Sequence, residues 1–167
     1  MADGLFETLA PIGQQAGRLL LERGETVAVI DGATGGLISA SLISLPGATR
    51  FFQGSGVVYT LESRSLLLGM TNQELRGMRS ATEEYALVQA RAVRQQFGAD
   101  WGVAETGSAG PGNHPMGVPN GISAIAVVGP QGQEFARIVR TDRDDRMANM
   151  GAFACAALEL LVERLSA

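Results

Sequence analysis

Apolar stretches at helical spacing alternate with short apolar runs along the 167 residues of this chain. In the first stretch, Leu9, Ala16 and Leu20 fall on one helical face. This helix is expected to end near Gly24, a residue suited to a C-cap. Residues 26–30 then form a short β-branched and apolar run, as expected for a strand covered on both faces. A helix followed by a buried strand predicts a layered α/β fold.

The same two patterns predict the remaining elements. Further strands are expected at residues 51–59, 101–105, 122–128 and 134–139, with a hairpin loop at 129–132. Further helices are expected at residues 37–45, 60–68 and 72–78, after a Ser80–Glu83 capping box, and in a C-terminal stretch that Asp142 caps. We therefore predict one three-layer α/β/α domain over residues 1–167, with a mixed, mainly parallel sheet.

Composition and charge exclude several classes of protein. Hydrophobic residues make up 46% of the chain, which rules out a disordered protein. No apolar run approaches the ~18 residues that span a bilayer, and the chain does not open on a signal segment. The net charge of −4 argues against a nucleic-acid-binding surface. We therefore expect a cytoplasmic protein with neither nucleic acid nor a membrane as its partner.

Three residue types limit the chemistry further. The single cysteine, Cys155, lies in an apolar stretch, where we expect an inert thiol and no internal disulfide. His114 is the only histidine, and no residues show metal-ligand spacing, so neither a metal nor another cofactor is predicted. All 13 basic residues are arginine, which stays protonated. A neutral amine is therefore unavailable as a base.

Two glycine-rich loops, residues 31–36 and 106–111, each follow a predicted strand. The first departs from a dinucleotide-binding fingerprint, because Ile38 replaces its third glycine and Arg50 lies near the place of the ribose-binding acid. In one interpretation the glycines only make tight turns. Loops at the carboxyl edge of a sheet more often form an anion or nucleotide pocket when hydroxyls lie between the glycines. The candidate ligand-binding residues are Thr34, Gly35, Gly36, Thr106, Gly107, Ser108 and Gly110.

Asp31 and Glu105 place one carboxylate beside each loop. A carboxylate there could activate water for amide hydrolysis without a covalent nucleophile. We favour the simpler interpretation, in which Asp31 caps the following helix and Glu105 is a solvated strand end. The hydroxyls of Thr34 and Ser108 are likewise interpreted as hydrogen-bond donors rather than as nucleophiles.

Short motifs also occur in a characteristic order along the chain. They include Thr34-Gly35-Gly36, Gly56-Val57-Val58-Tyr59, Gly98-Ala99-Asp100 and, as the most specific, Thr106-Gly107-x-Ala109-Gly110-Pro111. Together they resemble the CinA C-terminal domain, the nicotinamide-nucleotide amidase family, from about residue 20 to residue 161. The resemblance implies a three-layer α/β/α domain. It also implies a metal-free site that, in active members, hydrolyses nicotinamide mononucleotide to nicotinic acid mononucleotide and ammonia.

The chain departs from the family pattern at the positions that carry this chemistry. The position of the family's serine nucleophile holds Gly32, and the position of its lysine base holds Arg64, whereas the assisting tyrosine is present as Tyr59. Glycine cannot form an acyl intermediate, and an arginine, which stays protonated, cannot take a proton from a hydroxyl. Near the C-terminal end, Arg143 matches a G-D-R motif and is expected to pair with an anionic ligand. The family's second arginine is matched one position early, by Arg146.

We therefore expect a catalytically impaired homologue that keeps a pocket for a mononucleotide such as nicotinamide mononucleotide. Two alternatives stay open: an amidohydrolase with a different mechanism, and a structural or partner-binding module whose pocket is vestigial. The sequence does not define the oligomeric state and is compatible with a homo-oligomer. If the scaffold keeps the amidase geometry, Gly32→Ser combined with Arg64→Lys should restore detectable activity.

Overall fold

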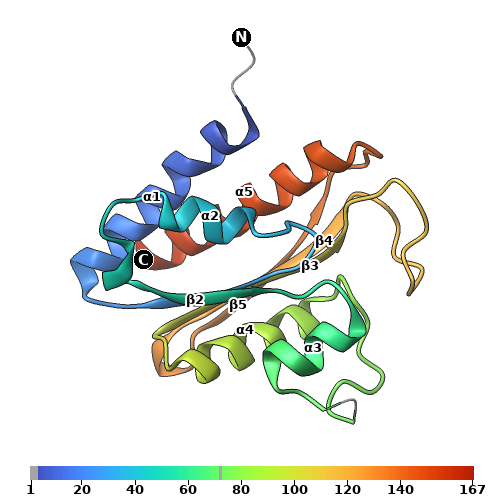
Figure 1. Cartoon of the computed structure of the whole chain (residues 1–167), viewed down its shortest axis with the longest axis horizontal. Coiled ribbons are helices and arrows are strands. Elements are labelled where there is room, and N and C mark those ends of the chain that lie inside the picture. Colours follow the sequence, from blue (N-terminus) through green and yellow to red (C-terminus); the bar gives the residue numbers. More distant parts are fainter. Residues whose placement is uncertain (1–3, 72) are drawn as a thin grey trace.

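A five-stranded sheet lies between two layers of helices in the computed structural model, which describes residues 4–71 and 73–167. Helices α1, α2 and α5 cover one face of the sheet, and α3 and α4 cover the other (Figure 1). The helices are α1 (Leu5–Arg23), α2 (Leu37–Ile43), α3 (Leu61–Leu68), α4 (Glu83–Phe97) and α5 (Arg146–Leu165). The strands are β1 (Val27–Asp31), β2 (Phe52–Val57), β3 (Trp101–Ser108), β4 (Ile122–Val128) and β5 (Glu134–Arg140). The predicted three-layer α/β/α class is confirmed.

The strand order in the sheet is β2-β1-β3-β4-β5, which places β1, β2 and β3 side by side. Strand β1 pairs in parallel with β2 and with β3, whereas β4 is antiparallel to both of its neighbours. Only β4 therefore runs against the common direction, as expected for a mixed, mainly parallel sheet. Because β1, β2 and β3 end at the same edge, the segments that follow them meet there.

Two apolar cores hold the layers together. On one face, Leu9 and Leu20 of α1 pack with the buried side chains of α2, α5 and the sheet. On the other face, Ala86 and Ala90 of α4 pack against β1 and β4. The predicted C-cap is confirmed at Gly24, whose φ of 65° lets its N–H reach the Leu20 carbonyl oxygen.

Two helix starts differ from the prediction. Helix α4 is capped by Thr82, whose hydroxyl oxygen accepts a hydrogen bond from the Tyr85 N–H at 3.3 Å, and not by Ser80. Helix α5 is capped by Asp145, which accepts from the Ala148 N–H at 3.1 Å, and not by Asp142. In both places several capping residues precede the helix, and the helical pattern does not choose among them.

Two other predictions also need correction. Residues 73–77 form turns and not the expected helix, and residue 72 lies outside the described residues. Strand β3 continues past the expected end at residue 105 to Ser108, because Thr106, Gly107 and Ser108 pair with β4. The second glycine-rich segment is thus partly strand, which fixes its backbone on the sheet.

Candidate functional site

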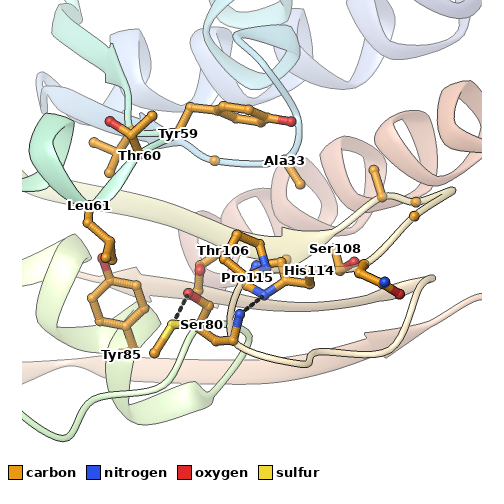
Figure 2. A pocket seen from close by; sticks show the side chains of 18 of the residues that line it. Ala33, Tyr59, Thr60, Leu61, Ser80, Tyr85, Thr106, Ser108, His114 and Pro115 are labelled. Carbon is orange, nitrogen blue, oxygen red and sulfur yellow. Dashed lines mark hydrogen bonds between the residues drawn. The ribbon is translucent and has the colours of Figure 1, made fainter.

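A cavity of about 560 Å³ opens where the segments after β1, β2 and β3 meet. This volume lies within the range of about 300–1,000 Å³ typical of small-molecule sites. Figure 2 shows Ala33 and Tyr59 on one side of the cavity and Thr106 and Ser108 on the other, with Tyr85 at the end near Leu61. The walls therefore come from both glycine-rich segments and from the α3–α4 layer.

Gly32 lines the cavity at the point where the first loop crosses β3. A Cβ atom at this position would lie 2.5 Å from the carbonyl oxygen of Glu105 and 3.3 Å from the Cα of Thr106. The close approach joins backbone to backbone, so no rotamer change can relieve it. Any side chain at position 32, serine included, requires the loop and β3 to move apart. The expected restoration of activity through Gly32→Ser therefore meets a steric obstacle that the sequence does not reveal.

Glu105 is fully buried beneath the first loop, which corrects the expectation of a solvated strand end. Its carboxyl accepts hydrogen bonds from the N–H groups of Gly32 and Thr34, at 3.2 and 2.9 Å. Asp31, also fully buried, accepts from the N–H groups of Ile38 and Ser39 at the start of α2, as the capping interpretation predicts. Neither carboxyl lines the cavity, so both support the loop rather than face a ligand.

Burial raises the pKa of the Glu105 carboxyl above its usual value, and Asp31 acts in the same direction. The hydrogen bonds around Ser123 agree with a protonated acid. The Ser123 hydroxyl contacts both the Glu105 carboxyl and the carbonyl oxygen of Thr106, although it carries a single proton. A neutral Glu105 resolves this conflict by donating to Ser123, which then donates to Thr106.

Arg64 enters the cavity wall from α3 and is only 6% exposed. Its guanidinium carbon lies 5.1 Å from the ring centroid of Tyr85, whose hydroxyl accepts a hydrogen bond from the Gln89 amide at 2.9 Å. In the described part of the chain, no carboxylate forms a salt bridge with Arg64. Burial raises the pKa of the Tyr85 phenol, an effect that Arg64 opposes. The phenol is therefore neutral at neutral pH and provides no countercharge.

Arg146, the first residue of α5, joins two walls of the cavity. Its guanidinium donates to the Gly110 carbonyl oxygen and to the Tyr59 hydroxyl, each at 2.8 Å. Tyr59 itself is 65% exposed, which places this pair at the mouth. The described lining residues include no Asp or Glu, so two guanidinium groups dominate the charge of the cavity.

Two polar side chains of the lining, those of Ser108 and His114, are already engaged in hydrogen bonds. The Ser108 hydroxyl donates to the Asn120 side-chain oxygen at 3.3 Å. His114 accepts a hydrogen bond from the Met116 N–H at its Nδ1, at 3.1 Å, and burial lowers the pKa of the imidazole. The neutral ring therefore carries its proton on Nε2 and offers no free lone pair to a serine. This arrangement gives Ser108 no general base.

The structure brings some of the sequence-predicted site residues together and leaves others apart. Those that line the cavity are Gly32, Tyr59, Arg64, Thr106, Gly107, Ser108 and Gly110. Thr34, Gly35 and Gly36 belong to the first glycine-rich loop but do not line the cavity. The Thr34 hydroxyl instead donates to the Asp31 carboxylate at 2.7 Å. Arg143 is exposed and lies outside the lining, where Arg146 stands in its place.

Two buried polar residues of the lining were not predicted as site residues: Tyr85 was interpreted as a core or rim residue, and Gln89 was missed. Their signal is present in the sequence, because both interrupt the apolar face of α4 at a spacing of one helical turn. Sequence reasoning also missed the contribution of residues 112–116, which line the cavity. That segment has no periodic pattern from which its position could be predicted.

Three other expectations concern residues away from the cavity walls. Burial raises the pKa of the half-buried Cys155 thiol to about 11, as expected for an inert cysteine, and the nearby Glu159 adds to the effect. Among residues 4–71 and 73–167, no three His, Cys, Asp or Glu side chains are grouped so that they could hold a metal ion. Within the same residues, none of the helices has the length and apolar character needed to cross a membrane.

The same α/β/α fold occurs in solved structures of competence-damage proteins. The competence/damage inducible protein CihA from Agrobacterium tumefaciens superposes with a TM-score of 0.86 at 24% identity, covering 95% of this chain and 96% of that one. A CinA superfamily protein from Klebsiella pneumoniae superposes with a TM-score of 0.85 at 23% identity, covering 95% and 98%. At these identities the likeness shows a shared fold.

Residues 9–165 match the family model described as the CinA C-terminal domain, and the chain belongs to this family. A CinA-like protein from Synechocystis sp. is 36% identical over 155 residues, which cover 92% of this chain and 37% of that protein. A CinA-like protein from Gloeobacter violaceus is 38% identical over 112 residues, which cover 67% and 26%. The chain thus spans about a third of the length of these curated relatives.

Proposed function

We propose that this domain binds a small anionic molecule, a mononucleotide such as nicotinamide mononucleotide, and does not hydrolyse it. The observation that carries the proposal is the cavity between the three loops, which holds two guanidinium groups and no carboxylate among its described lining residues. Arginines recognise phosphate through charge-assisted, bidentate hydrogen bonds. Backbone groups of Gly107 and Gly110 face the same space and need no particular side chain to contribute.

Two features support the absence of hydrolysis. The serine position of the family pattern holds Gly32, where a side chain would collide with the Glu105 carbonyl oxygen. The lysine position holds Arg64, which remains protonated and cannot serve as a base. Nucleophile and base act as a unit, so the loss of both is expected to remove several orders of magnitude in rate.

A different hydrolytic mechanism has no support in the geometry. Activation of water would need a carboxylate in contact with the cavity, but Asp31 and Glu105 are buried beneath its floor. The hydroxyls of Thr34 and Ser108 are also unsuited as replacement nucleophiles, because Thr34 lies outside the cavity lining and Ser108 has no general base. The other alternative, a structural or partner-binding module with a vestigial pocket, is tested by the binding experiment below.

The test combines calorimetry with an ammonia assay on the purified chain. Nicotinamide mononucleotide, adenosine monophosphate, ribose 5-phosphate and inorganic phosphate are titrated separately, and thermal unfolding is followed with each ligand. We expect saturable binding of at least one mononucleotide that weakens in Arg146→Gln. Ammonia release from nicotinamide mononucleotide at ~1 per second or faster would contradict the absence of hydrolysis. Absence of binding by every ligand would favour a structural or partner-binding module.

A further inference from the structure

Arg64 is a buried cation without a countercharge in the described part of the protein. It is 6% exposed, and none of the salt bridges among the described residues includes it. Its guanidinium carbon lies over the Tyr85 ring, 5.1 Å from the ring centroid. Contact with an aromatic face stabilises a desolvated cation by less than removal of the ion from water costs, so the charge of Arg64 is incompletely compensated.

The ring beside Arg64 is held in place before any ligand arrives. Tyr85 is 2% exposed, and its hydroxyl accepts a hydrogen bond from the Gln89 amide. The guanidinium of Arg64 lies beside this ring in the cavity wall, where burial already restricts the side chain, so less freedom remains to be lost on binding.

A second polar group at the same end of the cavity is incompletely paired. Gln89 is 2% exposed, and its side-chain oxygen has no hydrogen-bond partner in the described part of the chain. The Gln89 N–H₂ already donates to the Tyr85 hydroxyl, so the amide helps to hold the ring, and the donors at this end of the cavity are those of Arg64.

We infer that the Arg64 end of the cavity binds a carboxylate of the ligand, so that the domain selects an acid over the corresponding amide. The inference rests on the proposed function, since it names the chemistry of the ligand for the same cavity. A guanidinium has only donors, and a carboxylate presents two acceptor oxygens to its fork. A carboxamide presents one oxygen and turns an N–H₂ group toward the same donors, which leaves both partners incompletely paired.

The experiment compares nicotinic acid mononucleotide with nicotinamide mononucleotide, which differ only in this group. Calorimetry on the unmodified protein should give about tenfold or greater preference for the acid, as one charge-assisted pair supplies. In Arg64→Gln the preference should disappear. Arg64→Lys, which keeps the charge and loses the fork, should retain only part of it. Arg18→Gln, an exposed position on α1, is the matched control and should leave both affinities unchanged.

A second control separates a specific pair from the general field of the cavity. Arg146→Gln should weaken both mononucleotides by a similar factor and keep their ratio, because Arg146 lies at the mouth beside Tyr59. Far-UV circular dichroism and thermal unfolding check that each variant is folded, and the comparison on the unmodified protein needs no variant.

The outcomes distinguish the two levels of the proposal. Equal binding of acid and amide, or preference for the amide, would overturn the inference and leave the proposed function in place. Loss of ribose 5-phosphate binding in Arg64→Gln, without a preference for the acid, would place the phosphate at Arg64 and would also overturn it. Binding of neither of these two mononucleotides would overturn the inference, and absence of binding by adenosine monophosphate, ribose 5-phosphate and inorganic phosphate as well would overturn the proposed function too.

Discussion

Replacement of Gly32 by alanine should destabilise the fold, because the added Cβ would collide with the backbone of β3. The added Cβ would lie 2.5 Å from the Glu105 carbonyl oxygen, whereas carbon and oxygen atoms in close contact are about 3.3–3.6 Å apart. The first loop and β3 must therefore separate by roughly 1 Å, which also stretches the hydrogen bond from the Gly32 N–H to the Glu105 carboxyl. Overpacking of this kind costs about 1–3 kcal/mol.

Urea denaturation and thermal unfolding measure the loss. For a domain of this size, 1 kcal/mol corresponds to about 2–4 °C, so the Tm should fall by roughly 2–12 °C. Gly56→Ala is the matched control, because it is a strand glycine whose Cβ would meet only flexible side-chain atoms, the nearest being Leu67 Cδ1 at 3.3 Å. The control should stay within about 0.5 kcal/mol of the unmodified protein. Equal stability of Gly32→Ala and Gly56→Ala would refute the steric argument.

The same collision sets the expectation for restored catalysis. The double variant Gly32→Ser with Arg64→Lys should release no ammonia from nicotinamide mononucleotide, because the serine cannot take its place without displacing β3. A folded double variant that hydrolyses the nucleotide would show that the loop has enough freedom to accept a nucleophile.

Three further expectations follow from the geometry. The pKa of Glu105 is raised in the folded state, so its contribution to stability is present below its unfolded pKa of about 4.5 and is lost as the pH rises toward the folded pKa. Urea denaturation from pH 4 to 8 should therefore show Glu105→Gln gaining stability relative to the unmodified protein as the pH rises. Parallel pH profiles of the two proteins would count against a neutral acid. With a pKa of about 11, Cys155 should be alkylated by iodoacetamide at pH 8 much more slowly than free cysteine in the folded protein and at the ordinary rate in urea; equal rates would be inconsistent with burial. Tyr59→Phe removes one of the two acceptors of Arg146 and should weaken mononucleotide binding in calorimetry by a smaller factor than Arg146→Gln, whereas unchanged affinity would argue that the mouth is not part of the site.

The periodic parts of the fold could be predicted because burial repeats along them. The apolar run of β4 was expected at the residues where the structure has it, and the C-cap at Gly24 follows from the end of the apolar stripe. The turns at residues 73–77 have no such repeat, and their polar side chains gave a false helical signal. Burial of Glu105 could not be predicted either, because it depends on a loop some 70 positions earlier in the chain folding over the end of β3.

One error of register explains two differences between the sequence prediction and the structure. The segment before α5 contains Asp142-Arg143 and then Asp145-Arg146, the same pair of residues repeated three positions later. The prediction used the first pair for the cap and for the arginine of the pocket, whereas in the structure Asp145 caps α5 and Arg146 lines the cavity. Helix capping strength is the same for either aspartate, so the choice depends on how much chain is needed to reach from β5 to the start of α5.

Gly32 and Arg64 act on different properties of the same cavity. The absence of a Cβ at Gly32 lets the first loop lie directly on β3, and this contact buries the carboxyl of Glu105 and closes the floor. The guanidinium of Arg64 is a permanent charge in the wall, fixed by Tyr85, and no proton transfer at neutral pH can remove it. Substitutions at position 32 should therefore change the unfolding transition, whereas those at position 64 should change the choice of ligand. A cavity with a sealed floor and a fixed positive wall is suited to hold an anion, because neither group has to move or change its protonation when the ligand enters.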